Sequence, residues 1–234
     1  MELVMSRKTR MYLPGVPTHV VQRGNNRDAC FFAEEDFQFY KEVLAEGLNR
    51  YGAQLHAYCL MTNHVHLLIT PNFTDSISRI LQHIGRQYVC YINKTYKRSG
   101  TLWEGRHKSS LVDAENYLLV CYRYIELNPV VAGIVKMPEE YPWSSYNANV
   151  WGKGDSLVAP HELYLNLHAE KLMREREYRE LFRANLSAQD LHAIRESLSA
   201  NQVLGQARFK EQIESALERK IGFMKRGRPA GVVG

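Results

Sequence analysis

Closely paired cysteines are missing from this chain. Its four cysteines, Cys30, Cys59, Cys90 and Cys121, are far apart, form no CxxC pair and lie in otherwise apolar segments. Zinc sites and disulfide-rich small domains both depend on closely spaced cysteines. We therefore exclude both frameworks and expect four buried thiols.

Long apolar runs are missing as well. A bilayer-spanning helix needs about 20 consecutive apolar residues, and no segment approaches that length. The N-terminal sequence MELVMSRKTRMYLPG lacks the apolar region of a secretory signal peptide. No P-loop pattern occurs, so no nucleotide cofactor is expected. We expect no membrane partner and a cytoplasmic, nucleoid-associated location.

Acidic residues are nearly absent from one central stretch. The whole chain has 30 Lys and Arg against 25 Asp and Glu, a balance that decides little. Between residues 76 and 110, however, Glu104 is the single acid among many bases. We predict that these bases contact DNA phosphates; they are Arg79, Arg86, Lys94, Lys97, Arg98, Arg106 and Lys108.

Aromatic residues are interleaved with these cations, at Tyr88, Tyr91, Tyr96 and Trp103. Such a mixture combines phosphate contacts with base stacking and favours single-stranded or hairpin DNA. In the alternative interpretation the aromatic rings face the core and the cations form a solvated helix face. The sequence leaves both interpretations open.

The order of predicted elements indicates an α+β fold. Apolar spacing and turn signals divide the first 128 residues into strands and helices. Strands are predicted at 18–22, 54–60, 64–70 and 102–112, and helices at 33–50, 75–97 and 114–128. This order suits a ferredoxin-like antiparallel sheet with helices on one face.

A composition change after residue 150 predicts two parts. With 45% hydrophobic and 24% charged residues, the chain can form a domain of about 150 residues and a smaller one. We expect a catalytic domain over 1–150 and a helical module over 151–234. The segment WGKGDSLVAP would link them, and helices are predicted at 161–185, from the cap-like Ser187, and at 206–221.

The pattern His64-Val65-His66 is a candidate metal site. Alternate side chains of a strand share a face, so the two imidazoles lie about 7 Å apart. Both could reach one divalent cation, completed by a third ligand. An isolated His-x-His pattern is more often structural or solvent-facing, so it does not decide the matter alone.

Tyr124 and Asn128 share a helix face just before Pro129. Pro129 disfavours the helical conformation in its predecessor and predicts the end of this helix. A helical tyrosine is usually an amphipathic residue at the edge of a core. Neither Tyr124 nor Asn128 is informative alone.

Other polar residues of the same helix lie elsewhere on its surface. Tyr122 points to a different side from Tyr124, and Tyr117 is two turns away. Glu126 faces away from Tyr124 and Asn128, and we expect it to be solvated.

Several segments in order resemble one family. NHVHLLI, a basic helix and YIELNPVVAG are accompanied by PGVPTHVVQRGNNR, RHKSSLVD and YPWSSY. Over roughly residues 7–147 the chain resembles the HUH superfamily, specifically single-tyrosine transposases of the IS200-like fold and their REP-associated branch.

The resemblance implies a mechanism. The family's metal ligands match His64, His66 and Asn128, and its nucleophile matches Tyr124. Mobile-element members typically have Gln as the third ligand, so Asn128 is a departure shared with the REP-associated branch. The implied enzyme uses Mg²⁺ or Mn²⁺, cuts single-stranded hairpin repeats through a 5′-phosphotyrosine link, and acts as a homodimer.

Two other functions and one further motif remain open. A domesticated protein could bind repeat DNA without cutting it, and a replication or conjugation relaxase shares the metal and tyrosine chemistry. The intact ligand set argues against the first, and chain length against the second. Near the end, Arg226 and Arg228 resemble an AT-hook core that enters the minor groove, although a disordered basic tail is the alternative.

Overall fold

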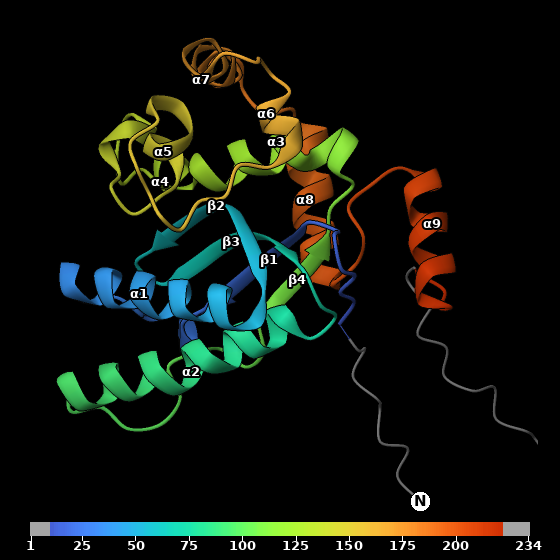
Figure 1. The fold of residues 1–234 in the computed structure, drawn as a ribbon. Helices are drawn as coiled ribbons and strands as arrows, with labels where there is room; N and C mark the ends of the chain where they lie inside the picture. The colour runs from blue at the N-terminus through green and yellow to red at the C-terminus, as the bar shows by residue number, and fades with distance from the viewer. Residues whose placement is uncertain (1–9, 222–234) are drawn as a thin grey trace, which may run out of the picture.

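The computed structural model of the chain describes residues 10–221. Its centre is a four-stranded antiparallel sheet with the strand order β2-β3-β1-β4 (Figure 1). The strands are β1 (Thr18–Arg23), β2 (Ala53–Met61), β3 (His64–Pro71) and β4 (Lys108–Leu111). The two central strands, β3 and β1, carry the sequences HVHLLITP and THVVQR. A strand was predicted at 102–112, and the corresponding strand, β4, is much shorter than expected.

Two helices connect the strands and cover one face of the sheet. α1 (Glu34–Tyr51) joins β1 to β2, and α2 (Ser76–Thr95) joins β3 to β4. α1 begins with three acidic residues, which suit a helix N-terminus, and ends at Gly52, whose φ of 68° favours glycine. With this connectivity and strand order, the predicted α+β, ferredoxin-like fold is confirmed.

The core between this helix pair and the sheet is apolar. Val65, Leu67 and Ile69 of β3 point toward α1 and α2 and have no exposed surface. Tyr88 and Trp103 also lie in this cluster, and the Tyr88 hydroxyl donates a hydrogen bond to the Cys30 carbonyl oxygen. These two aromatic residues are core residues, so for them the structure supports the second of the two interpretations, in which the rings face the core.

The opposite face of the sheet is covered too. α3 (Ala114–Glu126) crosses it above β2 and β3, and α8 (Ala188–Ala200) packs beside β1 and β4 (Figure 1). The expectation of helices on one face alone was wrong in this respect. β2 reads YCLM near its end, and an unbroken apolar run indicates a strand buried on both faces. Tyr58 and Leu60 contribute to one core, and Cys59 and Met61 to the other.

Short helices follow α3. They are α4 (Asn128–Val131), α5 (Tyr146–Trp151), α6 (Glu162–Leu165), α7 (Lys171–Glu180) and α9 (Ala207–Leu217), with a 3-10 turn at Pro138–Glu140. Another 3-10 turn, Asn25–Arg27, follows β1. The single helix predicted over 161–185 is thus two helices separated by a break. The cap at Ser187 is confirmed, because its side chain accepts a hydrogen bond from the Asp190 backbone N–H.

The C-terminal helices share a core with the sheet. Tyr164, Tyr178 and Ile194 lie in the same apolar cluster as Cys59 and Leu68. Residues 151–160 have little regular structure, as a linker would, but they pair with β2 through a bridge between Leu55 and Val158. The division into two domains at residue 150 stays a prediction. Residues from before and after this position pack in the same apolar cluster.

Two smaller expectations have different outcomes. Cys30, Cys59 and Cys121 are buried as expected, whereas Cys90 is exposed on α2. Across residues 10–221, none of the helices combines the length and apolar character that crossing a membrane requires.

Candidate active site and nucleic-acid interface

The four residues singled out in the sequence meet in one pocket. His64 and His66 project from β3, Tyr124 lies on α3, and Asn128 begins α4; all four line a pocket of about 620 Å³. The ring centroids of His64 and His66 are 4.9 Å apart, and those of His66 and Tyr124 are 5.8 Å apart. His64 and Asn128 are 64 residues apart in the sequence, but they line the same pocket because α3 crosses the sheet above β3.

Hydrogen bonds fix how His64 presents its ring. Its Nδ1 lies 2.6 Å from the Asn63 Oδ1. The Asn63 amide nitrogen donates to the Arg27 carbonyl oxygen, so the Asn63 oxygen must be the acceptor facing His64. His64 Nδ1 therefore carries the proton, which leaves the Nε2 lone pair as a ligand.

His66 is held in a similar way, by a residue that the sequence did not reveal. Its Nδ1 is 2.9 Å from Nε2 of His19 on β1, and the two rings stack with centroids 5.2 Å apart. His19 has no exposed surface, and none of the described residues forms a hydrogen bond with its Nδ1. If His66 donates from Nδ1, its Nε2 lone pair is available as a ligand, as second-layer partners of metal-bound histidines commonly ensure.

All three imidazoles favour the neutral form. Burial lowers the pKa of His19 to about 3. Burial, together with Arg23, lowers the pKa of His64 to about 4. Burial and the neighbouring His19, His64 and Arg23 lower the pKa of His66 well below its usual value. Neutral imidazole is the form that can bind a cation.

Asn128 presents an oxygen for a structural reason. Pro129 has no N–H, so it cannot donate to the carbonyl of Ile125 one turn earlier. The Asn128 amide nitrogen takes over, donating to the carbonyl oxygens of Tyr124 at 2.7 Å and Ile125 at 3.3 Å. The NH₂ group must face those carbonyls, so Oδ1 is left as the group that can coordinate a cation.

This donor set fits a divalent cation. Within residues 10–221 no cluster of three or more His, Cys, Asp or Glu suits a metal ion, and His19 directs its Nε2 at His66. A third protein ligand would therefore be the Asn128 oxygen. Two imidazole nitrogens and one amide oxygen leave other positions open for phosphate oxygens or water.

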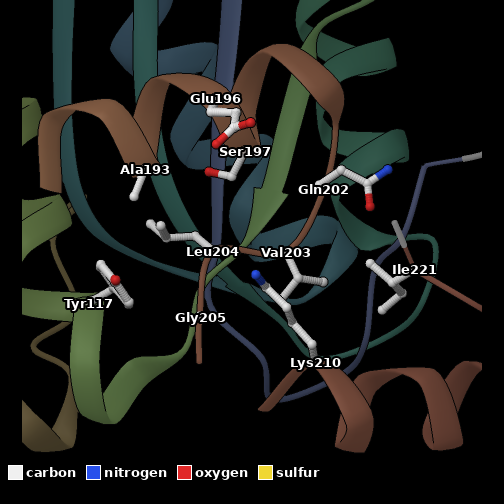
Figure 2. Close-up of a pocket in the computed structure, with 10 residues that line it drawn as sticks. All are labelled: Tyr117, Ala193, Glu196, Ser197, Gln202, Val203, Leu204, Gly205, Lys210 and Ile221. Atoms are coloured by element: carbon white, nitrogen blue, oxygen red, sulfur yellow. The ribbon is translucent and has the colours of Figure 1, made fainter. Parts of the chain in front are cut away.

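Neither of the other tyrosines of α3 singled out in the sequence reaches this pocket. Tyr122 is buried, with its ring 6.4 Å from Tyr164 and 5.9 Å from Tyr178. Tyr117 lines a different pocket of about 220 Å³, between α3 and the segment after α8, with Glu196 and Lys210 (Figure 2). No histidine lines that second pocket. Tyr124 is thus the tyrosine of the histidine pocket.

Five basic residues surround the histidine pocket: Arg23, Arg27, Arg106, Lys108 and Arg195. Among residues 10–221, Glu104 is the one acid in its lining. Only Arg106 and Lys108 were predicted. Arg23 and Arg27 lie in the turn-forming segment QRGNNR, and Arg195 comes from α8, so no basic run in the sequence marked them. The pocket is suited to a polyanion.

The other predicted DNA contacts lie elsewhere. Arg79, Arg86 and Lys94 belong to α2, which packs on the sheet face away from this pocket. Arg79 forms an ion pair of 2.8 Å with Asp75. Lys97 and Arg98 follow α2, and the Arg98 guanidinium lies over the Phe32 ring. Arg226 and Arg228 fall outside the described residues.

Glu126 is buried, so the expectation that it is solvated was wrong. It faces away from Tyr124 and has no exposed surface. Its carboxylate accepts hydrogen bonds from the Ser145 hydroxyl at 2.6 Å, the Asn149 amide at 2.8 Å and the Tyr178 hydroxyl at 2.7 Å. Burial raises its pKa to about 7. These contacts fasten the helix that carries Tyr124 to the C-terminal segments.

Comparisons with known proteins agree with this architecture. The model of the family described as "Transposase IS200 like" matches residues 14–128. A protein of Haemophilus influenzae assigned as a REP-associated tyrosine transposase is 24% identical over 122 residues, covering 47% of this chain and 69% of that protein. A solved REP-associated tyrosine transposase bound to a REP hairpin has a TM-score of 0.53 at 20% identity, over 67% of this chain and 93% of that chain, and so shows the fold. Residues 14–128, just under half of this chain, match the IS200-like transposase family, and the chain resembles the REP-associated tyrosine transposases.

Proposed function

We propose that this protein is a metal-dependent endonuclease and strand transferase that cuts single-stranded, hairpin-forming DNA. The observation that carries the proposal is the meeting of Tyr124, His64, His66 and Asn128 in one cationic pocket. A phenol hydroxyl beside a cation-binding donor set is the arrangement that nucleophilic attack on a phosphodiester requires.

Tyr124 is the nucleophile in this proposal. Its phenol oxygen bonds to the scissile phosphorus, and the bond from phosphorus to the 3′ oxygen breaks. The phenol proton is lost and the 3′ oxygen gains one, so the products are a 5′-phosphotyrosine and a free 3′-hydroxyl. Attack by that hydroxyl, or by another, reverses the step and rejoins DNA without a nucleotide cofactor.

The surrounding residues position and neutralise the phosphate. Arg23, Arg106 and Lys108 place positive charge around the group where negative charge develops. His64, His66 and Asn128 would hold Mg²⁺ or Mn²⁺, which supplies Lewis-acid polarisation of the phosphoryl group. Asn63 and His19 orient the two imidazoles through their Nδ1 atoms.

Hairpin DNA is the proposed substrate. The relative with the same fold was solved with a REP hairpin bound, and five basic residues line the pocket here. A homodimer is proposed from the family resemblance, and sedimentation of the purified chain would test it.

The test is formation of a covalent adduct. The purified chain is incubated with a labelled library of single-stranded hairpins, with Mn²⁺ or with EDTA, and analysed on a denaturing gel. We expect a metal-dependent adduct that Tyr124→Phe abolishes. Tyr117→Phe is the matched control, since it removes a hydroxyl of the same helix from a different pocket, and it should keep the adduct.

Two outcomes would contradict the proposal. An adduct that survives Tyr124→Phe would show that another residue is the nucleophile. Tight hairpin binding without any adduct, under every divalent cation tried, would instead support a non-catalytic protein that binds repeat DNA.

A further inference from the structure

A second, apolar pocket adjoins the histidine pocket. It has a volume of about 290 Å³, and its apolar walls are Leu127, Val130, Val131, Leu186 and Leu191. We call it the apolar pocket. Its volume lies near the lower end of small-ligand sites. Val131 is 73% exposed, so an apolar surface here faces solvent.

The apolar pocket is continuous with the proposed reaction site. Tyr124, Asn128 and Arg195 line both pockets. A ligand group bound in the apolar pocket would therefore lie directly beside a phosphate at Tyr124. In a DNA strand, the groups nearest to a given phosphate are the sugars and bases on either side of it.

The walls come from two parts of the chain. Leu127, Val130 and Val131 lie at the end of α3 and in α4, whereas Leu186 and Leu191 lie at the start of α8. The Arg123 guanidinium donates to the Ala184 carbonyl oxygen and ties these parts together. Of the five apolar wall residues, Leu127 lies within the family match at 14–128 and the other four lie beyond it. The pocket is thus built where the C-terminal helices meet the transposase domain.

We infer that the apolar pocket binds the unpaired base of a nucleotide that flanks the scissile phosphate. A nucleobase has apolar faces and a polar edge, and enzymes bind unstacked bases between apolar side chains with hydrogen bonds to that edge. The Asn185 amide and the Arg195 guanidinium supply polar groups at this lining. The inference rests on the proposed function, because it takes the cut strand as the source of the base.

The charge of the lining favours DNA over a protein segment. In the part of the chain that the structure describes, the lining contains Arg195 and no Asp or Glu, and the adjoining pocket has five cations against one acid. An apolar group attached to a polyanion suits this pair of pockets. A basic peptide would have to enter against the cations.

The test measures what the base adds to binding, without any reaction. The full chain is titrated, with NMR detection, with the four deoxynucleoside 5′-monophosphates and with 2-deoxyribose 5-phosphate, which lacks a base. We expect at least one nucleotide to bind about tenfold more tightly than the sugar phosphate, within the range measured for base stacking.

Variants of the residues that line the apolar pocket then test whether the base binds there. Leu191→Trp fills the pocket and should remove the advantage of the base, while binding of the sugar phosphate stays the same. Val131→Glu is a second variant that does not threaten folding, because Val131 is exposed, and it should have the same effect. Leu172→Trp is the control, at a leucine of α7 that is 70% exposed and lines neither pocket.

The contradicting outcomes are distinct from failure of the proposed function. Equal binding of all five ligands, or a base advantage that both wall variants keep, would overturn the inference. A change in sedimentation in the wall variants, with unchanged nucleotide binding, would show that a second copy of the chain occupies the pocket and would also overturn it. A covalent adduct on a residue other than Tyr124 would refute the proposed function and leave this binding result standing.

Discussion

The two faces of one sheet have opposite characters. Toward α1 and α2, β3 presents Val65, Leu67 and Ile69, which have no exposed surface and lie in one apolar cluster. Toward α3, the same strand presents His64 and His66. Because a strand alternates its side chains, one short segment contributes to stability on one face and to chemistry on the other.

A polar face has requirements that an apolar face does not have. Apolar side chains need only to be covered, whereas each buried polar group needs a hydrogen-bond partner. On the α3 face these partners come from distant segments: His19 contacts His66, and Ser145, Asn149 and Tyr178 contact Glu126. The segments after residue 128 therefore complete the polar side of the fold.

Substitutions at two adjacent positions of β3 should distinguish the two faces most clearly, because one should lower metal affinity and the other should lower stability. His66→Ala should weaken Mn²⁺ binding by about 100-fold or more, because a proposed metal ligand is lost, as isothermal titration calorimetry can measure. Leu67→Ala should lower the free energy of unfolding by about 2–5 kcal/mol, because it leaves a cavity in the core, yet its folded form should bind Mn²⁺ normally.

Two results would contradict these expectations. Wild-type Mn²⁺ affinity in His66→Ala would remove this histidine from the proposed ligand set. Loss of Mn²⁺ affinity in Leu67→Ala, under conditions where circular dichroism shows it folded, would show that the two faces are not independent.

More of the apolar face of the sheet than of its polar face could be predicted from the sequence. Apolar periodicity placed both α1 and α2, and the His-x-His and Tyr-x-x-x-Asn patterns pointed to residues that meet in one pocket. His19 was missed because THVVQ has the pattern of an ordinary strand, and its partner is 47 residues away. Glu126 was correctly placed away from Tyr124, but a helical pattern cannot tell which later segment covers that side.

Basic runs were a weaker guide than apolar ones. The run in α2 was conspicuous in sequence, but that helix covers the other face of the sheet. The pocket instead collects cations from β1, the turn after it, the residues at and just before the start of β4, and α8. Arg106 and Lys108 belong to the basic stretch seen in the sequence, whereas the other three are brought to the pocket by the fold and leave no local pattern.

Glu126→Gln should change how stability depends on pH. A pKa raised to about 7 means that the folded state favours the protonated carboxyl. Its contribution is full below the unfolded pKa and is lost as pH rises through about 7. Relative to the wild type, Glu126→Gln should gain about 2 kcal/mol in unfolding free energy between pH 5 and pH 8.

Urea unfolding at a series of pH values would measure this difference. The buried histidines have lowered pKa values and destabilise the fold as pH falls below their unfolded values, but they do so in both proteins and cancel. A difference that stays constant from pH 5 to pH 8 would show that the Glu126 carboxyl does not change its charge in this range.

Substitution of His19 should change Mn²⁺ affinity by a smaller amount, through the polar face of the sheet alone. His19→Phe keeps a flat ring against His66 but removes the nitrogen that accepts from its Nδ1, so Mn²⁺ affinity should fall about tenfold. His19→Gln restores an acceptor oxygen and should recover most of the affinity. Mn²⁺ titration followed by electron paramagnetic resonance would measure both. Equal losses in the two variants would instead assign His19 a packing role.

Two exposed arginines test which face of the sheet DNA follows, and here the expected effect is smallest. Arg195 lines the histidine pocket from α8, and Arg86 lies on α2. In a Tyr124→Phe background, Arg195→Gln should weaken hairpin binding and lower the slope of log affinity against log salt by about 1, because one phosphate contact is lost. Arg86→Gln removes the same charge from the other face and should leave the slope unchanged, as fluorescence anisotropy at several salt concentrations would show. An equal loss in Arg86→Gln would mean that DNA wraps onto the α2 face, and that the basic run in the sequence marks a true contact.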